Sequence, residues 1–224
     1  MSSNSITRYS KALFIRLPKT AGTSIESIFR NYSEVVTPLV NKTEQGNKER
    51  VSRASAYREI IGNNKWGNLF TFTFVRNPYD RCVSLWQMFE PDVSFNSFVK
   101  KISTLGIETS NIYERLTYHC CLQSPHLTDD KGKIIVDFIG KFENLEEDYF
   151  KICKKIRLPK TKLPHKRKTY HKHYSKYYDN ETKTMVTEIY KKDLEILGYD
   201  FERLNLIDNI KDELEYKNFW FRFH

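Results

Sequence analysis

The sequence predicts an α/β fold, because each of three buried strands is followed by a segment with helical periodicity. Strands are expected at 12–15, 69–75 and 134–139, and the helices after them begin near Ser24, at Pro78 and at Leu145. This alternation is typical of a sheet covered by helices. At 224 residues the chain is long enough for one core, so we expect a single domain over 1–224, with a flexible N-terminus at 1–10 and an amphipathic tail at 205–224.

The stretch Leu13–Phe29 joins the first strand to the first helix through a short loop. Pro18 ends the strand, because proline lacks a backbone donor and disfavours a helical residue before it. Residues 19–24 are small apart from Lys19, so loop amides, hydroxyls, the helix N-terminus and one mobile cation can face a single anion. We expect phosphate or sulfate here. The alternative is a turn whose threonine and serine only cap the helix.

The same loop differs from the phosphate loop of common ATPases and GTPases. That motif places a lysine directly after its second glycine, whereas Lys19 precedes Gly22, the only glycine of the loop. An ordinary ATPase or GTPase is therefore disfavoured.

A second strand-to-helix junction follows Val75. Asn77 suits a helix N-cap and Pro78 suits the first helical position. Arg76 at the strand end and Ser84 in the second helical turn could share a second phosphate. The alternative is that Arg76 and Arg81 pair with Asp80 or with surface carboxylates.

The remaining elements are expected from periodicity and from cap residues. Residues 31–68 are expected to be loops around a short helix at 55–61. Further helices are expected at 95–102, 111–122 and 145–156. A turn at 129–133 should precede the strand 134–139, and one long helix should run from its N-cap Asp179 to Gly198.

Composition narrows the classes of partner and compartment. The net charge of +9 favours an anionic ligand, nucleic acid or an acidic polymer. The four cysteines, Cys82, Cys120, Cys121 and Cys153, show neither a disulfide framework nor paired zinc spacing, so we expect reduced thiols. No leader or membrane-spanning segment is evident, and we expect a soluble, cytoplasmic protein.

Residues 160–176 form a strongly basic segment with tyrosines among the charges. One interpretation is a solvated surface, and another is a basic flap over a bound polyanion. Aromatic residues among cations also fit nucleic-acid binding, which keeps a binding protein without turnover as an alternative.

Three motifs in order give the chain a family resemblance. Residues 17–24 (LPKTAGTS), 74–81 (FVRNPYDR, with Ser84) and 137–145 (DFIGKFENL) together resemble the carbohydrate sulfotransferases related to heparan and chondroitin enzymes, especially small bacterial members. The resemblance continues through His119-x-x-x-Gln123, Leu163-Pro164-His165, Tyr177-Tyr178 and residues 197–199, and covers most of 12–201. It implies a three-layer, P-loop-like fold with a central, mainly parallel sheet.

The resemblance also implies a donor and the residues that hold it. The donor would be 3′-phosphoadenosine 5′-phosphosulfate (PAPS), the product 3′-phosphoadenosine 5′-phosphate (PAP), and no metal would be needed. The 5′-phosphosulfate would be held by the loop residues Lys19, Thr20, Ala21, Gly22, Thr23 and Ser24. The 3′-phosphate would be held by Arg76 and Ser84, and the flap residues Lys166, Arg167 and Lys168 would cover the nucleotide. Lys19 would also stabilise the leaving nucleotide.

The chain departs from this family at the catalytic base. Relatives commonly carry a histidine before the short helix, where this chain has Arg53. His119 is therefore the candidate base, and the other candidates are Glu44, Glu49 and Glu59. Two further departures are Leu122, where relatives show proline, and the more basic flap at 166–169.

The expected activity is sulfuryl transfer to an acceptor hydroxyl, usually on a glycan. One alternative is the basic nucleotide- or nucleic-acid-binding protein. Another is a small-molecule or nucleotide kinase, which the missing phosphate-loop motif disfavours. Nucleic acid is the less favoured partner. The sequence assigns neither the acceptor nor the oligomeric state.

Overall fold

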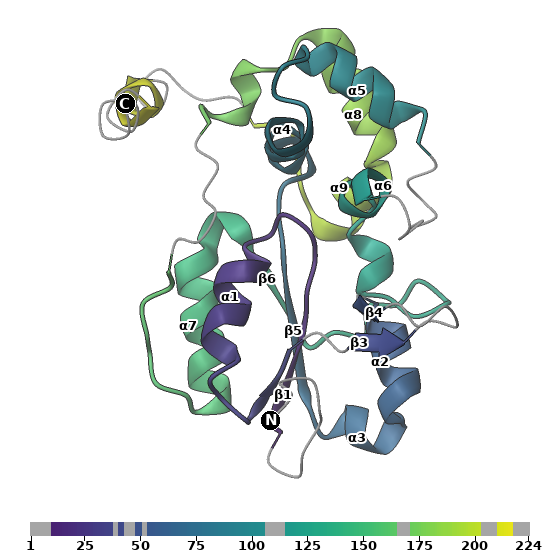
Figure 1. The fold of residues 1–224 in the computed structure, drawn as a ribbon, viewed down its shortest axis with the longest axis vertical. Helices are drawn as coiled ribbons and strands as arrows, with labels where there is room; N and C mark the ends of the chain where they lie inside the picture. The colour runs from purple at the N-terminus through teal and green to yellow at the C-terminus, as the bar shows by residue number, and fades with distance from the viewer. Residues whose placement is uncertain are drawn as a thin grey trace. The chain divides into compact units, whose positions relative to one another are not determined.

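A computed structural model describes residues 10–37, 40–42, 48–50, 53–105, 115–164, 171–202 and 210–216 (Figure 1). The chain divides into two compact units, and each is built from two separate segments. The first, here called the sheet unit, comprises 1–76 and 123–166. The second, the helical unit, comprises 77–122 and 167–224. The single domain expected over 1–224 stays a prediction.

The sheet unit contains a four-stranded sheet in the order β2-β1-β5-β6. All three strand pairs are parallel. The strands are β1 (Ala12–Ile15), β2 (Val35–Val36), β5 (Phe70–Val75) and β6 (Phe138–Lys141). Parallel strands are joined through helices, which explains why the segments around the chain's strands show helical periodicity. The predicted α/β class with a parallel sheet is confirmed.

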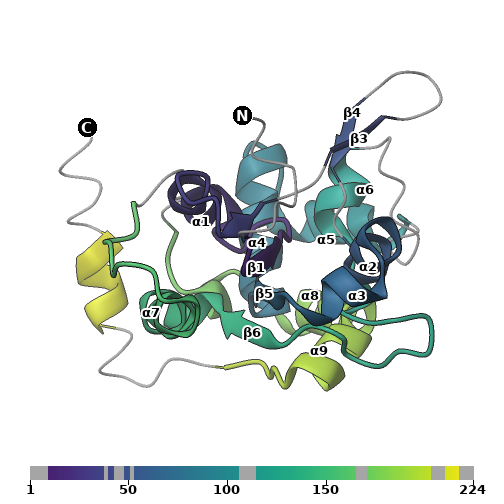
Figure 2. The ribbon, with the colours of Figure 1, turned by 90° about the horizontal axis from the view of Figure 1, so that it is seen from below.

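Helices cover both faces of this sheet. In the views of Figures 1 and 2, α1 (Gly22–Phe29) and α7 (Leu145–Ile156) lie on one side, and α2 (Ala54–Ile61) and α3 (Asn63–Gly67) lie on the other. The core under α1 and α7 is aromatic: the ring of Phe72 lies 5.3 Å from that of Phe14 and 5.4 Å from that of Phe29. The three predicted layers are present in this unit.

The segment 31–68 is richer in structure than predicted. Besides α2 it contains β2, α3 and a two-stranded antiparallel pair, β3 (Val40–Lys42) with β4 (Lys48–Arg50). These elements are two to five residues long, which is too short for a periodic pattern to reveal.

The strand predicted at 134–139 is displaced toward the C-terminus. Ile134 forms only an isolated antiparallel bridge with Thr128, and β6 begins at Phe138. The side chain of Asp137 accepts hydrogen bonds from the backbone N–H and the hydroxyl of Thr71, both at 2.8 Å. This contact fixes where β6 begins, so the parallel pairing starts only after Asp137.

The turn predicted at 129–133 is present, since Asp129 Oδ1 accepts hydrogen bonds from the backbone N–H groups of residues 131 and 133.

The helical unit packs its helices around a second apolar core. Its elements are α4 (Pro78–Phe89), α5 (Phe95–Ser103), α6 (Arg115–Cys120), η3 (Tyr174–Lys176), α8 (Asn180–Ile189) and α9 (Lys191–Leu197), and residues 210–216 are also helical. At the start of α4, Asn77 accepts a hydrogen bond from Tyr79 N at 3.0 Å, so the predicted cap is confirmed. The core includes Cys82, Phe98 and Val186.

The long helix predicted from Asp179 to Gly198 is interrupted at Tyr190, which separates α8 from α9. Tyr190 is fully buried, and its hydroxyl donates to the carbonyl of Cys120 at 2.9 Å. Asp179 caps α8 and Gly198 ends α9 at φ 65°, both as predicted. The helix predicted at 111–122 is observed as α6, and residues 111–114 lie outside the described residues.

All four cysteines are buried free thiols, as predicted. No helix in the described ranges is both long enough and apolar enough to cross a bilayer. Residues 1–9, most of the tail and its terminal aromatics at 219–223 lie outside the described residues.

Candidate functional site

The loop between β1 and α1 contains two non-glycine residues in the left-handed region. Lys19 has φ 65° and Ala21 has φ 63°. Each such residue costs roughly 1–2 kcal/mol for an L-amino acid, and residues of this kind cluster at ligand sites. Left-handed positions within a turn also direct successive backbone N–H groups toward one side, which makes an anion-binding concavity.

The first turn of α1 has no side-chain cap at its N-cap. The N-cap residue is Ala21, and the carbonyl of Ala21 accepts from Ser24 N at 2.9 Å. The backbone N–H groups at the first helical positions, Gly22 and Thr23, have no acceptor within a helix. The alternative of a turn that only caps the helix is therefore not what the loop shows. Its geometry suits an anion at the positive end of α1.

Two hydroxyl groups of the loop, those of Thr20 and Thr23, have hydrogen-bond partners within the chain. Thr20 is fully buried, and its hydroxyl donates to the carbonyl of Leu17 at 3.1 Å, which closes the loop. The hydroxyl of Thr23 accepts from Arg16 Nη2 at 3.2 Å. The backbone N–H groups and the Lys19 ammonium are thus the main candidate ligands that this loop offers.

Arg16 is a loop-supporting residue that the sequence analysis missed. Its Nη1 lies 2.9 Å from Glu26 Oε2, and Glu26 also pairs with Arg30. A Cβ atom at Gly22 would lie 2.8 Å from Arg16 Nε, so the side chain of Arg16 passes where any larger residue would stand. In the sequence, the four-residue spacing of Glu26 and Arg30 points to this group of charges, because residues at that spacing meet on a helix surface.

Arg76 stands at the end of β5, beside the loop. Its Nη1 donates to the carbonyl of Lys19 at 3.3 Å, and its guanidinium lies 4.1 Å from the ring centroid of Phe142. The register pairs Val75 with Lys141, so Arg76 and Phe142 follow as neighbours at the same edge of the sheet. The structure therefore brings together two of the predicted anion ligands, Lys19 and Arg76.

The side chain of Gln123 fixes the backbone of Arg76. Its oxygen accepts from Arg76 N at 3.0 Å, and its nitrogen donates to Arg76 O at 2.9 Å. Gln123 is fully buried, and Arg76 is 6% exposed. The amide thus takes the place of a neighbouring strand where β5 ends.

Three further residues named in the sequence analysis, Ser84, His119 and Arg81, belong to the helical unit. Ser84 is a buried residue of α4, and His119 is a half-buried residue of α6. His119 Nδ1 lies 2.7 Å from the carbonyl of Arg115. A carbonyl only accepts, so Nδ1 carries the proton and the neutral ring has its lone pair on Nε2. Arg81, predicted as a possible partner of carboxylates, instead donates to the carbonyls of Cys120 and Cys121.

The remaining candidate residues lie outside the described residues, in β4, on α2 or at the N-cap of α2. Lys166, Arg167, Lys168 and Glu44 lie outside the described residues, and the side chain of Glu49 is not among those described. Glu59 is exposed on α2, and Arg53 is the N-cap residue of that helix. Among the described residues, no three His, Cys, Asp or Glu side chains form a group that could hold a metal ion.

Comparison with known proteins gives one family match. The model of the sulfotransferase family matches residues 5–200. An uncharacterized protein of Archaeoglobus fulgidus is 36% identical over 109 residues, which are 46% of this chain and 79% of that protein. No solved structure matches the chain.

Proposed function

The chain belongs to the sulfotransferase family, whose members transfer a sulfuryl group to an acceptor, and on that premise we propose PAPS as the donor and a carbohydrate hydroxyl as the acceptor. The family match spans both units of the chain.

One observation carries the choice of donor: Arg76 contacts the backbone of Lys19 at 3.3 Å, at the carboxyl edge of a parallel sheet. Ligands of open α/β sheets bind at this edge. The contact brings together two residues with cationic side chains, one after β5 and one in the loop after β1, through the backbone carbonyl of Lys19. A nucleotide with phosphate groups at both its 5′ and its 3′ positions requires cations from more than one element.

The residues present fit such a donor. The N–H groups at the start of α1 suit the 5′-phosphosulfate, because they lie at the positive end of the helix. Arg76 suits the 3′-phosphate, since a guanidinium can donate two parallel hydrogen bonds to it. The expected contribution of the Ser84 hydroxyl stays a prediction.

When bound, PAPS supplies an activated sulfuryl group. Lys19 would neutralise the negative charge that develops on the departing nucleotide, as cations do in the related phosphoryl transfers. The backbone of Lys19 is left-handed, and Arg76 donates to its carbonyl, so Arg76 supports the loop that carries this side chain.

A base must take the proton of the acceptor hydroxyl as the new bond forms. His119 is our candidate, because its contact with Arg115 leaves Nε2 as the basic nitrogen. Glu59 is the alternative among residues whose side chains are described. A pH profile of the transfer rate that loses its acidic limb in His119→Ala, but not in Glu59→Gln, would support the assignment.

The donor site is tested by calorimetric titration of PAP, the product nucleotide. We expect Lys19→Ala and Arg76→Ala each to weaken PAP binding by about ten- to a hundredfold, as for lost charge-assisted hydrogen bonds. Lys65→Ala, an exposed lysine on α3, is the matched control and should bind PAP as the unaltered chain does.

Absence of PAP binding in the unaltered chain would refute the proposed donor. Nucleic-acid binding that falls steeply with salt and survives Lys19→Ala would favour the basic binding protein instead.

A further inference from the structure

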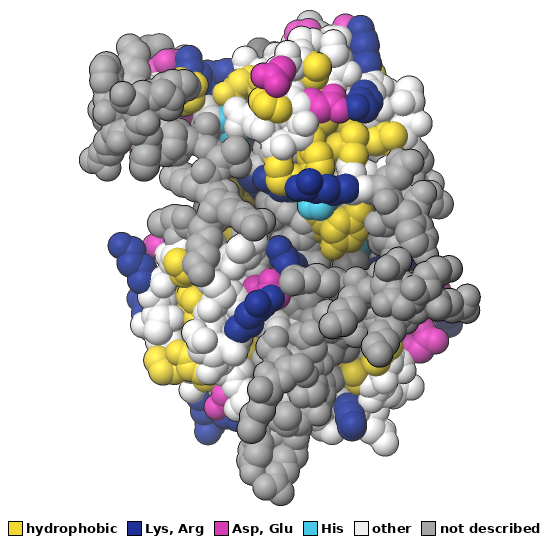
Figure 3. Space-filling model, in the orientation of Figure 1, with side chains coloured by type: hydrophobic (Ala, Val, Ile, Leu, Met, Phe, Trp, Pro, Cys, Tyr) yellow, Lys and Arg dark blue, Asp and Glu magenta, His cyan; other side chains and the backbone are white. Residues whose placement is uncertain are grey.

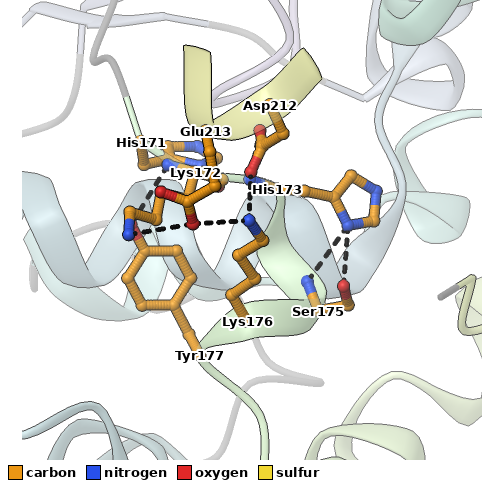
Figure 4. Close-up of polar contacts among 8 residues, drawn as sticks. All are labelled: His171, Lys172, His173, Ser175, Lys176, Tyr177, Asp212 and Glu213. Carbon is orange, nitrogen blue, oxygen red and sulfur yellow. Dashed lines mark hydrogen bonds and ion pairs between the residues drawn. The ribbon is translucent and has the colours of Figure 1, made fainter. Parts of the chain in front are cut away.

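In the helical unit, a basic segment contacts an acidic helix from the end of the chain (Figure 4). The basic segment is 171–176, and the acidic helix is 210–216. Lys172 Nζ lies 3.1 Å from Glu213 Oε1, and Lys176 Nζ lies 2.8 Å from the same atom. Lys176 Nζ also lies 3.1 Å from Asp212 Oδ2.

A backbone group completes this set of contacts. The N–H of His173 donates to Asp212 Oδ1 at 2.8 Å, while its imidazole points away toward Ser175 (Figure 4). Two ammonium groups and one N–H therefore bind the carboxylates of two adjacent residues.

Charge, rather than apolar burial, holds the acidic helix in this place. Its two large aliphatic side chains, Ile210 and Leu214, are 56% and 55% exposed. A seven-residue helix is not stable alone in water, and ion pairs that solvent reaches are weak and screened by salt; the paired side chains here are 20–39% exposed. A competing anion can therefore displace this helix at little cost.

The Glu213 carboxylate at the basic segment is held in its charged form. Hydrogen bonds from Lys176 and then Lys172 lower the pKa of Glu213. Sulfate and carboxylate groups of another chain offer the same oxygen acceptors to the same donors.

We propose that Lys172, the His173 backbone and Lys176 form a binding surface for a sulfated or carboxylated polysaccharide, and that Asp212 and Glu213 occupy it as an internal competitor. Binding of the polysaccharide exchanges the acidic helix for the anionic groups of the ligand. None of these residues belongs to the donor loop. The surface is proposed to bind the polysaccharide, and no catalytic role is assigned to it.

The aromatic side chains of this region favour a saccharide over nucleic acid. Single-stranded nucleic acid binds by stacking its bases on open aromatic faces. Tyr174 is 5% exposed, Tyr177 packs on Trp86 at 5.6 Å, and Tyr178 packs on Phe95 at 4.8 Å. These rings belong to the core of the unit, and Tyr216 already faces the ammonium of Lys172 at 5.2 Å.

The charge pattern agrees with this choice. Among the coloured residues of each unit in Figure 3, the lysine and arginine side chains lie dispersed, and both lysines of the basic segment pair with Asp212 or Glu213. A nucleic-acid groove requires a continuous basic stripe. A local cluster of two lysines suits a short anionic stretch of a saccharide instead.

The test compares binding of a heparin octasaccharide by calorimetry, at fixed salt and without nucleotide. Asp212→Asn with Glu213→Gln should tighten binding by about tenfold, because the internal competitor loses its charge. Glu188→Gln with Glu195→Gln changes the net charge equally at exposed positions of α8 and α9, and should change the affinity less than about twofold.

The reciprocal variant removes the surface itself. Lys172→Gln with Lys176→Gln should weaken binding by about tenfold, whereas Lys191→Gln with Lys192→Gln on α9 should not. Equal affinities of the acidic-helix variant and its control would overturn the competitor. Equal losses in the two lysine variants would overturn the surface. Tighter binding of a single-stranded oligonucleotide of matched charge would overturn the choice of polysaccharide.

Discussion

The side chain of Gln123 forms two hydrogen bonds with the backbone of Arg76, one as acceptor at 3.0 Å and one as donor at 2.9 Å. These residues are separated by 47 positions in the chain. The pair fixes Arg76 at the point where β5 ends and where its guanidinium reaches Phe142 and the Lys19 carbonyl. Gln123 is therefore a positioning residue for the proposed 3′-phosphate ligand.

Replacing Gln123 by methionine should impair recognition of the 3′-phosphate. Methionine has a similar volume but leaves a buried N–H and a buried C=O unpaired, at a cost of about 1–3 kcal/mol each. We expect PAP to bind about tenfold more weakly, while AMP, which lacks the 3′-phosphate, keeps its affinity. Calorimetric titration of both nucleotides measures the difference.

A general loss of fold would weaken both nucleotides alike, and that result would contradict a specific role for Gln123. Gln123→Glu is the informative companion, because its carboxylate can still accept from Arg76 N but cannot donate to Arg76 O.

Gly140→Ala should destabilise the sheet unit. A Cβ atom there would lie 2.6 Å and 2.8 Å from two ring carbons of Phe74, and 3.2 Å from Asp148 Cβ. Phe74 is fully buried, so its ring has no room to move. Overpacking of this kind costs about 1–3 kcal/mol. The free energy of unfolding from a urea titration measures the loss.

Gly67→Ala provides the matched control for that substitution. Gly67 ends α3, and a Cβ atom there would meet nothing within 4 Å. Its effect should be close to zero or slightly stabilising, because alanine is favoured over glycine in a helix. Equal unfolding free energies for the two variants would show that the space around Gly140 is not restrictive.

The sequence predicted the two strand-to-helix junctions because their signals are local. Pro18 lies shortly after β1 ends at Ile15, and Asn77 with Pro78 starts α4, so neighbouring residues suffice to place both junctions. Lys19 and Arg76 could be singled out for the same reason, since Arg76 follows β5 directly and Lys19 follows Pro18 in the loop after β1.

The features that sequence missed depend on residues far apart in the chain. The start of β6 depends on Asp137 and Thr71, and the break between α8 and α9 occurs at Tyr190, which bonds to Cys120. These partners are 66 and 70 positions apart, so periodicity within a short window carries no trace of them.

Asp179→Ala should lower the melting temperature of the helical unit. The Asp179 side chain accepts from Thr182 N at 2.7 Å, and the Thr182 hydroxyl lies 3.0 Å from Asp179 N, which completes a capping box. We expect a decrease of roughly 2–4 °C at pH 7, as for the loss of an N-cap in a chain of this size. Asp130→Ala, at an exposed turn position, should leave the melting temperature unchanged.

The effect of the cap should also depend on pH. Hydrogen bonds from Thr182, first from its backbone N–H and then from its hydroxyl, lower the pKa of Asp179. A carboxyl with a lowered folded pKa stabilises the protein above its unfolded pKa, about 3.9, and loses that contribution as pH falls through the folded value. The difference between the unaltered chain and Asp179→Ala should therefore shrink below about pH 4. A difference that stays constant down to pH 2 would contradict this account.

Arg81→Met should be the most destabilising of these changes. Arg81 and Asp193 are both fully buried, and Arg81 contacts the ring of Tyr190 at 5.2 Å. Burial alone would lower the pKa of Arg81, but the neighbouring side chains of Tyr190 and Asp193 raise it overall, so the guanidinium stays charged. Removing Arg81 leaves Asp193, which is also buried, without the positive charge that acts on it, and such a loss costs about 3–5 kcal/mol. Urea unfolding measures this loss.

The double variant separates charge pairing from packing. Arg81→Met with Asp193→Leu removes both charges and fills their space with apolar groups, which for a buried ion pair is often neutral. We therefore expect the double variant to be more stable than Arg81→Met alone by about 1–3 kcal/mol, a coupling typical of neighbouring groups. If the stability lost in the double variant equals the sum of the losses in the two single variants, the charge of Asp193 does not compensate that of Arg81. The cost of Arg81→Met would then come from its hydrogen bonds to the carbonyls of Cys120 and Cys121.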